Sequence, residues 1–262
     1  MTDSVARVYL LLTVYNRKTE TLRALNYFRA TIPEITIIMN DDSPNAFLYS
    51  DLDCWNQFTR LKSSEKYWNR GMISAYEFMI NNCNPRESDI VICINNDIEI
   101  LDLDVLQLHA NDVFIGKFHD GKRSKTYGLR RIFSNFHPIA SWIRKVDHVT
   151  FNMNFASFRY DILKKYGFLD PYFHHGFGDY ELGSRLSLKG VSIKESDDFL
   201  GVCDRNPVTN TSLDKGLSLR ERLTLFHSVK EGVFSEKVYF LYKVYGFPGF
   251  FILIRQYLNV IF

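Results

Sequence analysis

A run of apolar residues that ends in oxygen-bearing side chains constrains this chain more than any other segment. Residues 90–94 are uninterrupted apolar positions, and Asn95, Asn96 and Asp97 follow them directly. Such a run is typical of a central parallel strand, and ligands in open α/β sheets bind at the carboxyl ends of these strands. Asn95 and Asp97 are two positions apart and share one face, where their oxygens suit Mg²⁺ or Mn²⁺. A polar turn that caps the strand for local reasons explains the same residues equally well.

Composition narrows the class of protein. Of the 262 residues, 46% are hydrophobic and 24% are charged, and the net charge is only +2. We therefore expect an ordinary globular protein of one large or two small domains, without a nucleic-acid partner. The four cysteines have no CxxC spacing, so they predict free thiols. Since no signal-peptide pattern and no segment of roughly 18 apolar residues is present, we expect a cytoplasmic protein.

Two further strands are predicted before the organising run. Residues 8–14 and 35–39 are apolar, and the residues between them have apolar positions at helical spacing. This pattern predicts a strand, a helix and a second strand in one parallel sheet. Polar residues end both runs: Tyr15, Asn16 and Arg17 follow the first, and Asn40, Asp41, Asp42 and Ser43 follow the second. In a parallel sheet these ends share an edge with Asp97, which is the usual position of a nucleotide site.

A helix is predicted to lead into the organising strand. Its apolar positions recur at helical spacing at Met72, Ala75, Tyr76, Met79 and Ile80. Trp68 and Gly71 stand at its start. Trp68 is more typical of packing against a sheet than of ligand contact, whereas Gly71 would let the backbone approach a diphosphate.

A basic segment follows Asp97, where the hydrophobic periodicity weakens. It combines three glycines with six cations, namely Gly116, Gly121, Gly128, Lys117, Lys122, Arg123, Lys125, Arg130 and Arg131. We interpret it as a loop that binds phosphates or an anionic membrane, or as a solvated loop with scattered charge. Further along, the pattern predicts a strand over residues 146–158, a helix over 160–166, and short strands over 191–193 and 199–202.

Residues 168–186 place two acids at the start of a predicted helix, among glycines and aromatics. Asp179 is interpreted either as a helix cap or as a general base. Glu181 is four residues from Arg185, which predicts a surface ion pair. His175, one of two adjacent histidines, is more typical of packing and hydrogen bonding than of metal ligation.

The last 25 residues are rich in aromatic and aliphatic side chains. Residues 238–262 also contain Lys243, Gly246, Pro248 and Arg255, which interrupt any membrane span. Aromatic residues beside basic ones suit an element at a membrane surface. A final helix that packs on the core or on another subunit is an equally good interpretation.

Four motifs in chain order resemble those of the inverting glycosyltransferases of family 2, and the resemblance runs from residue 8 to about residue 230. They are Thr13-Val14-Tyr15-Asn16-Arg17, Asn40-Asp41-Asp42-Ser43-Pro44, Asn95-Asn96-Asp97 and Gly178-Asp179-Tyr180-Glu181. The first two are similar to nucleotide-binding loops, the third to the DxD metal motif with Asn95 replacing the first Asp, and the fourth to the catalytic-base segment. Tyr67-Trp68, Arg185 and residues 201–207 resemble a bacterial rhamnosyltransferase-like subgroup that builds surface polysaccharide.

The resemblance implies an α/β fold of the GT-A (Rossmann-like) type, with a mostly parallel central sheet flanked by helices and a C-terminal acceptor-side region. It implies a nucleotide-sugar-binding half at residues 1–100, an acceptor-binding and catalytic half at 101–237, and the apolar and basic tail at 238–262. The implied reaction moves a sugar from a UDP- or dTDP-sugar to a hydroxyl of a glycan or polyprenyl-diphosphate-linked glycan, as in O-antigen or capsule synthesis. Mg²⁺ or Mn²⁺ is the implied cofactor, and the enzyme would act in the cytoplasm at the inner face of the cell membrane.

The resemblance also implies roles for individual residues. Asp179 is the expected base, and Asn95 and Asp97 are the expected metal ligands. The expected nucleotide contacts are Thr13, Tyr15, Asn16, Arg17, Asp41, Asp42, Trp68, Asn69 and Asn96, and the expected acceptor or supporting residues are Glu181, Arg185 and His175. Two alternatives stay open: a non-catalytic sugar-nucleotide-binding subunit, and a nucleotidyltransferase, although residues 15–18 do not match the glycine-rich phosphate loop of the latter.

Overall fold

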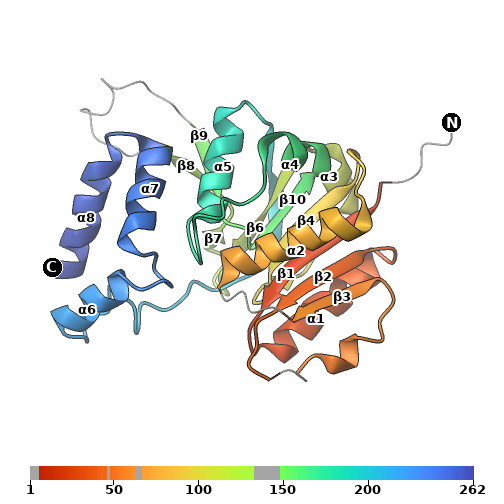
Figure 1. Cartoon of the computed structure of the whole chain (residues 1–262), viewed down its shortest axis with the longest axis horizontal. Helices are drawn as coiled ribbons and strands as arrows, with labels where there is room; N and C mark the ends of the chain where they lie inside the picture. Colours follow the sequence, from red (N-terminus) through yellow and green to blue (C-terminus); the bar gives the residue numbers. More distant parts are fainter. Residues whose placement is uncertain (1–5, 46–47, 63–66, 133–147) are drawn as a thin grey trace.

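Nine strands form one twisted sheet within the residues that the computed structural model describes, which are 6–45, 48–62, 67–132 and 148–262 (Figure 1). The sheet contains β1 (Val8–Val14), β2 (Thr36–Asp41), β3 (Phe58–Lys62), β4 (Ile90–Asn95), β5 (Glu99–Ile100), β6 (Val113–His119), β7 (Lys125–Tyr127), β10 (Phe155–Arg159) and β11 (Ile193–Val202). A separate pair consists of β8 (Leu129–Ile132) and β9 (His148–Phe151). The helices are α1 (Lys18–Thr31), α2 (Trp68–Cys83), α3 (Val105–Ala110), α4 (Tyr160–Tyr166), α5 (Gly178–Leu188), α6 (Leu219–Phe226), α7 (Phe234–Tyr245) and α8 (Gly249–Ile261), with a 3-10 turn at Ser50–Leu52.

The strand order of the sheet is β3-β2-β1-β4-β10-β6-β11-β5, with β7 beside β6. β1 pairs in parallel with β2 and β4, and β2 pairs in parallel with β3. β10 is antiparallel to both of its neighbours, β11 is parallel to β6, and β5 and β7 are short antiparallel additions. The predicted α/β fold with a mostly parallel central sheet is confirmed.

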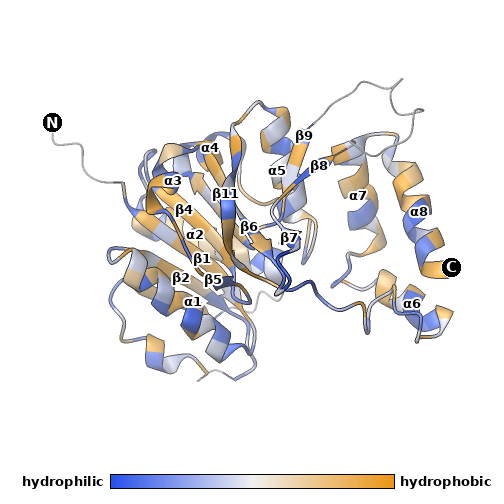
Figure 2. Ribbon diagram, turned by 180° about the vertical axis from the view of Figure 1, so that it is seen from behind, coloured by the Kyte–Doolittle hydropathy of each residue, from blue (hydrophilic) through white to orange (hydrophobic). Residues whose placement is uncertain are grey.

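Alternate residues of the central strands supply two separate cores. Leu10 and Leu12 of β1 face the core that α1 and α3 cover, whereas Tyr9 and Leu11 face the core that α2, α4 and α5 cover (Figures 1 and 2). β4 is buried on both faces along its apolar run. This double burial explains why its sequence shows no alternation of polar and apolar residues.

The expectation of a loop over residues 116–131 is wrong, because most of this segment is strand. β6, β7 and β8 account for it, and β6 lies in the sheet between β10 and β11. Phe114 and Phe118 of β6 face one core, and Val113 and Ile115 face the other. The basic side chains of these strands lie at exposed or partly exposed positions. In the sequence they interrupt the apolar pattern by which a strand is recognised.

Two other strand predictions change in detail. Residues 146–147 of the strand expected over 146–158 lie outside the described residues, and the rest is β9 and β10, with a turn at residues 152–154 between them. The two short strands expected near residues 191–202 are one strand, β11, whose register against β6 shifts between Glu195 and Phe199 and again before Gly201. The helix expected over 160–166 is confirmed as α4.

The C-terminal residues form a helical layer beyond α5 (Figure 1). Phe240 and Leu241 of α7 and Leu253 of α8 pack with Phe173 in a third apolar cluster. The expected start of the tail at residue 238 therefore lies inside α7. No helix in the described ranges is long and apolar enough to cross a membrane, and all four cysteines are free thiols, as predicted.

Candidate functional site

The loops after β1 and β2 meet at one edge of the sheet and are tied to each other. Asn16 has a φ of 54°, a left-handed conformation that turns the chain sharply after β1. Its backbone N–H donates to the hydroxyl oxygen of Ser43 at 3.0 Å, and the N–H of Asp42 donates to the carbonyl of Val14 at 3.2 Å. This geometry leaves Tyr15 pointing outward, with 59% of its surface exposed.

The end of β4 presents two free oxygens at the same edge. Asn95 donates through its side-chain nitrogen to the amide oxygen of Asn154 at 2.7 Å. Asp97 accepts from the guanidinium of Arg17, also at 2.7 Å. The Oδ1 atoms of Asn95 and Asp97 are buried and have no hydrogen-bond partner. A buried oxygen without a hydrogen bond costs free energy, so we expect a ligand at each of these two oxygens.

These two oxygens fit one side of a Mg²⁺ or Mn²⁺ site. Such ions bind through one or two protein carboxylates and complete their shell with water and substrate phosphate oxygens. Asn95 contributes a neutral oxygen, so the negative charge comes from Asp97 alone. The described residues contain no cluster of three His, Cys, Asp or Glu side chains that would form a complete protein cage.

Asp179 is held at the start of α5 by two backbone N–H groups. One carboxylate oxygen accepts from the N–H of Tyr180 at 2.8 Å, and the other accepts from the N–H of Met153 at 3.3 Å. Burial raises the pKa of Asp179 to about 6, although these N–H groups and the nearby positive charge of Arg130 oppose the rise. The residue as a whole is partly exposed.

The turn between β9 and β10 joins the two acids into one site. Met153 donates its backbone N–H to Asp179, and the next residue, Asn154, accepts from Asn95. The backbone of Asn95 also donates to the carbonyl of Asn154 at 3.1 Å. This short segment therefore connects Asp179 on α5 with the end of β4, two residues before Asp97, although 82 residues separate the two acids in sequence.

Asn69 and Gly178 explain why α5 begins where it does. The amide of Asn69 donates to the carbonyls of Asp170 and Phe173 at 3.1 and 2.9 Å, which fixes the loop before the helix. A Cβ atom at Gly178 would lie 1.8 Å from the Asn69 side-chain oxygen, so only glycine fits at this position. Asn69, one of the expected nucleotide contacts, is fully buried and anchors the loop that precedes Asp179.

Three other expected contacts also lie inside the protein. Thr13 is mostly buried, and a Cβ atom at Gly71 would lie 2.6 Å from its hydroxyl oxygen, so α2 packs tightly on β1 at this point. Gly71 thus serves helix–sheet packing rather than the expected close approach to a diphosphate. Asn96 donates to the buried hydroxyl of Thr21 on α1 at 3.0 Å. Thr13 and Asn96 therefore support the edge and do not face the open side.

The two acids of the second motif, Asp41 and Asp42, have different surroundings. Asp41 is fully buried, accepts from the N–H of Ser43 at 2.9 Å, and lies 3.4 and 3.6 Å from the cations of Lys62 and Arg60. Asp42 is partly exposed, its Oδ1 has no partner, and burial raises its pKa. Of the two expected nucleotide contacts, Asp42 is therefore the one with partial exposure and an unpaired oxygen, whereas Asp41 is occupied by partners within the protein.

Trp68 and His175 pack where α2 begins. Trp68 lies against the core beneath α2, as the packing interpretation predicts, and its indole nitrogen has no partner. Its backbone N–H donates to the ring nitrogen Nδ1 of His175 at 3.3 Å. Burial lowers the pKa of His175, which favours the neutral ring whose Nδ1 accepts this hydrogen bond.

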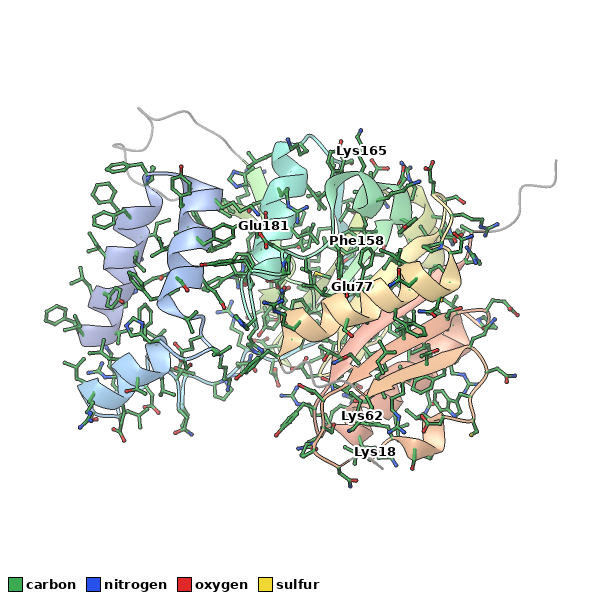
Figure 3. The ribbon with its side chains drawn as sticks, viewed as in Figure 1. Lys18, Lys62, Glu77, Phe158, Lys165 and Glu181 are labelled. Carbon is green, nitrogen blue, oxygen red and sulfur yellow. The ribbon has the colours of Figure 1, made fainter. Side chains whose placement is uncertain are left out.

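Glu181 belongs to a buried ion cluster between α5 and α7 (Figure 3). It pairs with Arg185 at 3.0 Å, as predicted, and with Lys243 of α7 at 2.8 Å. The expectation of a surface pair is wrong, because the Glu181 side chain is only 1% exposed. Lys243 also pairs with Asp170 at 2.8 Å, so this cluster ties the Asp179 helix to the C-terminal layer.

Two residues near the site gave no sequence signal for a role there: Cys203, which follows β11, and Asn154, in the turn between β9 and β10. The thiol of Cys203 accepts from Asn154 at 3.3 Å, and burial together with the charge of Asp97 raises its pKa to about 12. Arg130 lies over the ring of Tyr180 at 5.7 Å, close enough to lower the pKa of Asp179. An asparagine before a strand or a cysteine after one carries no functional signal in sequence.

Only part of the basic segment faces this site. Lys125 pairs with Glu195 of β11 at 2.6 Å, and Lys117 donates to the carbonyl of Asp197. Both cations therefore stabilise the edge of the sheet. Arg130 is the member of the segment that reaches the Asp179 side.

Comparison with known proteins supports the fold. The sequence matches no family model and no curated protein. In structure, the chain resembles a mannosyltransferase from Pyrobaculum calidifontis that was solved in complex with GDP-Man and Mn²⁺. The TM-score is 0.53 at 12% identity, over 99% of this chain and 82% of the other. The chain has a GT-A-like fold.

A second solved structure is similar at a lower level. It is a 4-diphosphocytidyl-2C-methyl-D-erythritol synthase, with a TM-score of 0.48 and 9% identity over 78% of this chain and 95% of the other. The GT-A-like fold places the ends of β1, β2 and β4 at the edge where ligands bind in open α/β sheets.

Proposed function

We propose that this protein is an inverting glycosyltransferase that moves a sugar from a nucleotide-diphosphate donor to a hydroxyl group of a carbohydrate acceptor. One observation carries the proposal: the turn at residues 152–154 bonds both to Asn95, two residues before Asp97, and to Asp179. Sugar transfer needs positive charge near the departing diphosphate and a carboxylate near the acceptor hydroxyl. The edge offers a residue for each task.

Asp179 has the properties of the base. Its carboxyl is held by two N–H groups, and with a pKa of about 6 it is ionised at neutral pH yet basic enough to take a proton. As the acceptor oxygen attacks the anomeric carbon, its proton passes to Asp179. The new C–O bond forms on the face opposite the breaking bond to the diphosphate, so the configuration inverts.

The departing diphosphate meets the Asp97 side of the site. Asn95 and Asp97 would hold Mg²⁺ or Mn²⁺ through their unpaired oxygens. A bound divalent ion neutralises charge on the leaving diphosphate. Arg17 already lies 2.7 Å from Asp97, so its guanidinium supplies further positive charge at the same place.

The donor and acceptor classes follow the family resemblance. We propose a UDP- or dTDP-sugar donor, with GDP-mannose added to the candidates because the similar mannosyltransferase is described with it. The proposed acceptor is a glycan or polyprenyl-diphosphate-linked glycan of bacterial surface polysaccharide, such as O-antigen or capsule. Residues 1–100 would hold the donor and residues 101–237 the acceptor, in a cytoplasmic enzyme.

The test separates transfer from the two alternatives. The protein is incubated with each nucleotide sugar and Mn²⁺, and release of the nucleoside diphosphate is measured with and without glycan acceptors. Release by wild type and its loss in Asp179→Asn support the proposal, with Asp197→Asn, an exposed acid on β11, as the matched control.

The other outcomes assign a different function. Thermal stabilisation by a nucleotide sugar without any release of nucleoside diphosphate would indicate a binding subunit. Pyrophosphate release from a nucleoside triphosphate and a sugar phosphate would indicate a nucleotidyltransferase. Either result would contradict the proposal.

A further inference from the structure

The C-terminal helix α8 is apolar on two different faces. Leu253 and Val260 face inward and are buried against the rest of the C-terminal layer. A second set of apolar residues faces outward, each between 40% and 58% exposed: Phe250, Phe251, Ile254, Leu258 and Ile261, here called the α8 stripe. A helix on a protein surface usually has a polar outer face, so the α8 stripe needs an explanation.

The α8 stripe is continuous along one side of the helix. At 3.6 residues per turn its five members fall within about a third of the helix circumference. Phe247 extends it at the N-terminal end and is 69% exposed, and Phe262 extends it at the C-terminal end and is 85% exposed. The rings of Phe247 and Phe250 each lie about 6 Å from that of Phe251. Figure 2 shows α8 at the outer edge of the molecule, with hydrophobic residues prominent along it.

The concentration of exposed apolar side chains is specific to this helix. Seven of the twenty large hydrophobic side chains that are exposed in the described residues lie in residues 247–262. Isolated exposed hydrophobic residues are normal, whereas a contiguous patch marks a surface that binds a protein partner or a membrane.

The charges around the α8 stripe favour a lipid bilayer over a second copy of the chain as its partner. Residues 237–262 contain no acidic residue, and Arg255, beside the stripe, is exposed. If two copies of α8 packed face to face, neither Arg255 would meet a carboxylate from the other helix. The phosphate groups of anionic lipids supply the missing negative charge, and phenylalanine side chains insert among the acyl chains below them.

The length of α8 shows how it would lie in a bilayer. Its 13 residues correspond to about 20 Å, well short of the roughly 30 Å hydrocarbon core. The helix therefore fits parallel to the membrane surface and not across it. Since Leu253 and Val260 stay buried in the protein, docking requires no unfolding of the C-terminal layer.

We propose that the α8 stripe docks the protein on the surface of an anionic lipid bilayer, with the stripe among the acyl chains and Arg255 at the phosphate level. This attachment does not depend on the proposed sugar transfer. It is tested by binding alone.

The experiment measures flotation of the full chain with two kinds of vesicle: phosphatidylcholine alone, and phosphatidylcholine mixed with phosphatidylglycerol. The double variant Phe250→Ser, Phe251→Ser should lower the partition coefficient at least about tenfold on the mixed vesicles. Arg255→Gln should lower it about fivefold on the mixed vesicles and leave binding to phosphatidylcholine unchanged. The control Leu106→Ser removes an apolar residue on α3 that is more exposed than either phenylalanine, at 77%, and should bind like wild type.

Folding is checked by far-UV circular dichroism, and a second variant, Ile254→Asp, should repeat the loss of binding if the first variant unfolds. Absence of wild-type flotation on the mixed, anionic vesicles overturns the proposal, as does full binding by the folded stripe variants. A dimer, seen by light scattering without vesicle binding and abolished by the stripe variants, would instead assign the stripe to a second copy of the chain.

Discussion

Asp179→Asn should make the protein more stable and nearly inactive at the same time. Burial raises the pKa of Asp179 from its ordinary value of 3.8 to about 6. At neutral pH the ionised Asp179 therefore lowers the free energy of unfolding by up to about 3 kcal/mol, compared with a group whose pKa is the same in both states. Asparagine has the same shape and no charge, so the variant avoids this cost.

Part of this gain is offset by a lost hydrogen bond. The carboxylate accepts from the N–H groups of Tyr180 and Met153, whereas an asparagine oxygen can accept from one of them only. Leaving the other N–H facing an NH₂ group costs about 1 kcal/mol. The expected net effect is a rise of about 2 kcal/mol in the free energy of unfolding near pH 7.

The pH dependence identifies the cause. The native state retains the Asp179 proton up to about pH 6, while the unfolded state releases it near pH 3.8, so this group lowers wild-type stability as the pH rises between these values. Urea unfolding of wild type and variant should show the variant's advantage appear over that interval and stay constant above it. Sugar transfer by Asp179→Asn should fall by roughly 10² to 10⁴-fold, with donor binding little changed.

A stability difference that does not vary between about pH 4 and pH 7 would refute the burial explanation. Transfer near the wild-type rate in Asp179→Asn would refute the assignment of the base. Wild-type kcat should also decline below about pH 6, where the carboxyl becomes protonated, and an unchanged rate in that range would contradict the same assignment.

The remaining predictions concern four other acids: Asp97, Glu181, Asp42 and Asp41. Asp97→Ala, or EDTA added to wild type, should abolish turnover of the donor, because the diphosphate loses its counter-charge; this is measured as nucleoside diphosphate release. Glu181→Gln should lower the free energy of unfolding by about 3 kcal/mol, because two cations lose a buried partner, and should reduce transfer less than Asp179→Asn does; urea unfolding and the transfer assay check both. Asp42→Ala should weaken nucleotide binding by about 1 to 3 kcal/mol in calorimetry, whereas Asp41→Ala should mainly lower stability.

Each of these predictions has a contradicting result. Full activity in EDTA would exclude a metal role and leave Asp97 as a partner of Arg17. A larger activity loss in Glu181→Gln than in Asp179→Asn would move the base to Glu181. Nucleotide affinity that falls in Asp41→Ala and not in Asp42→Ala would restore the original assignment.

The strands that were predicted correctly are those that can be recognised from their own residues alone. β1, β2 and β4 are continuous apolar runs that end in polar residues, and a run buried on both faces needs no partner to be recognised. The order of these runs also predicted the parallel sheet and the shared edge. β7 and β8 were missed because they are short and carry lysine and arginine side chains, one of which has its partner, Glu195, far along the chain. β6 was missed although its residues 113–115 are apolar, because glycine and lysine follow them directly.

The sequence also singled out the two acids on which the proposed site depends. Asp97 and Asp179 were both singled out from their motifs, because an acid at the end of a strand or the start of a helix is a local feature. Which neighbouring residues face the ligand was not predictable in the same way. Asp41 and Asp42 are adjacent and chemically identical, and only the position of β3, with Arg60 and Lys62, buries one of them.

Only the tertiary structure decided how the two acids are connected and what the C-terminal residues do. The turn at residues 152–154 reaches Asn95 on one side and Asp179 on the other, a contact between segments that no local pattern encodes. The tail showed aromatic and basic residues in sequence, but its division into a buried face and the α8 stripe depends on how α7 and α8 pack. Periodicity reveals that a residue is apolar and on which side of its helix it lies; what that side meets is set by packing between distant segments.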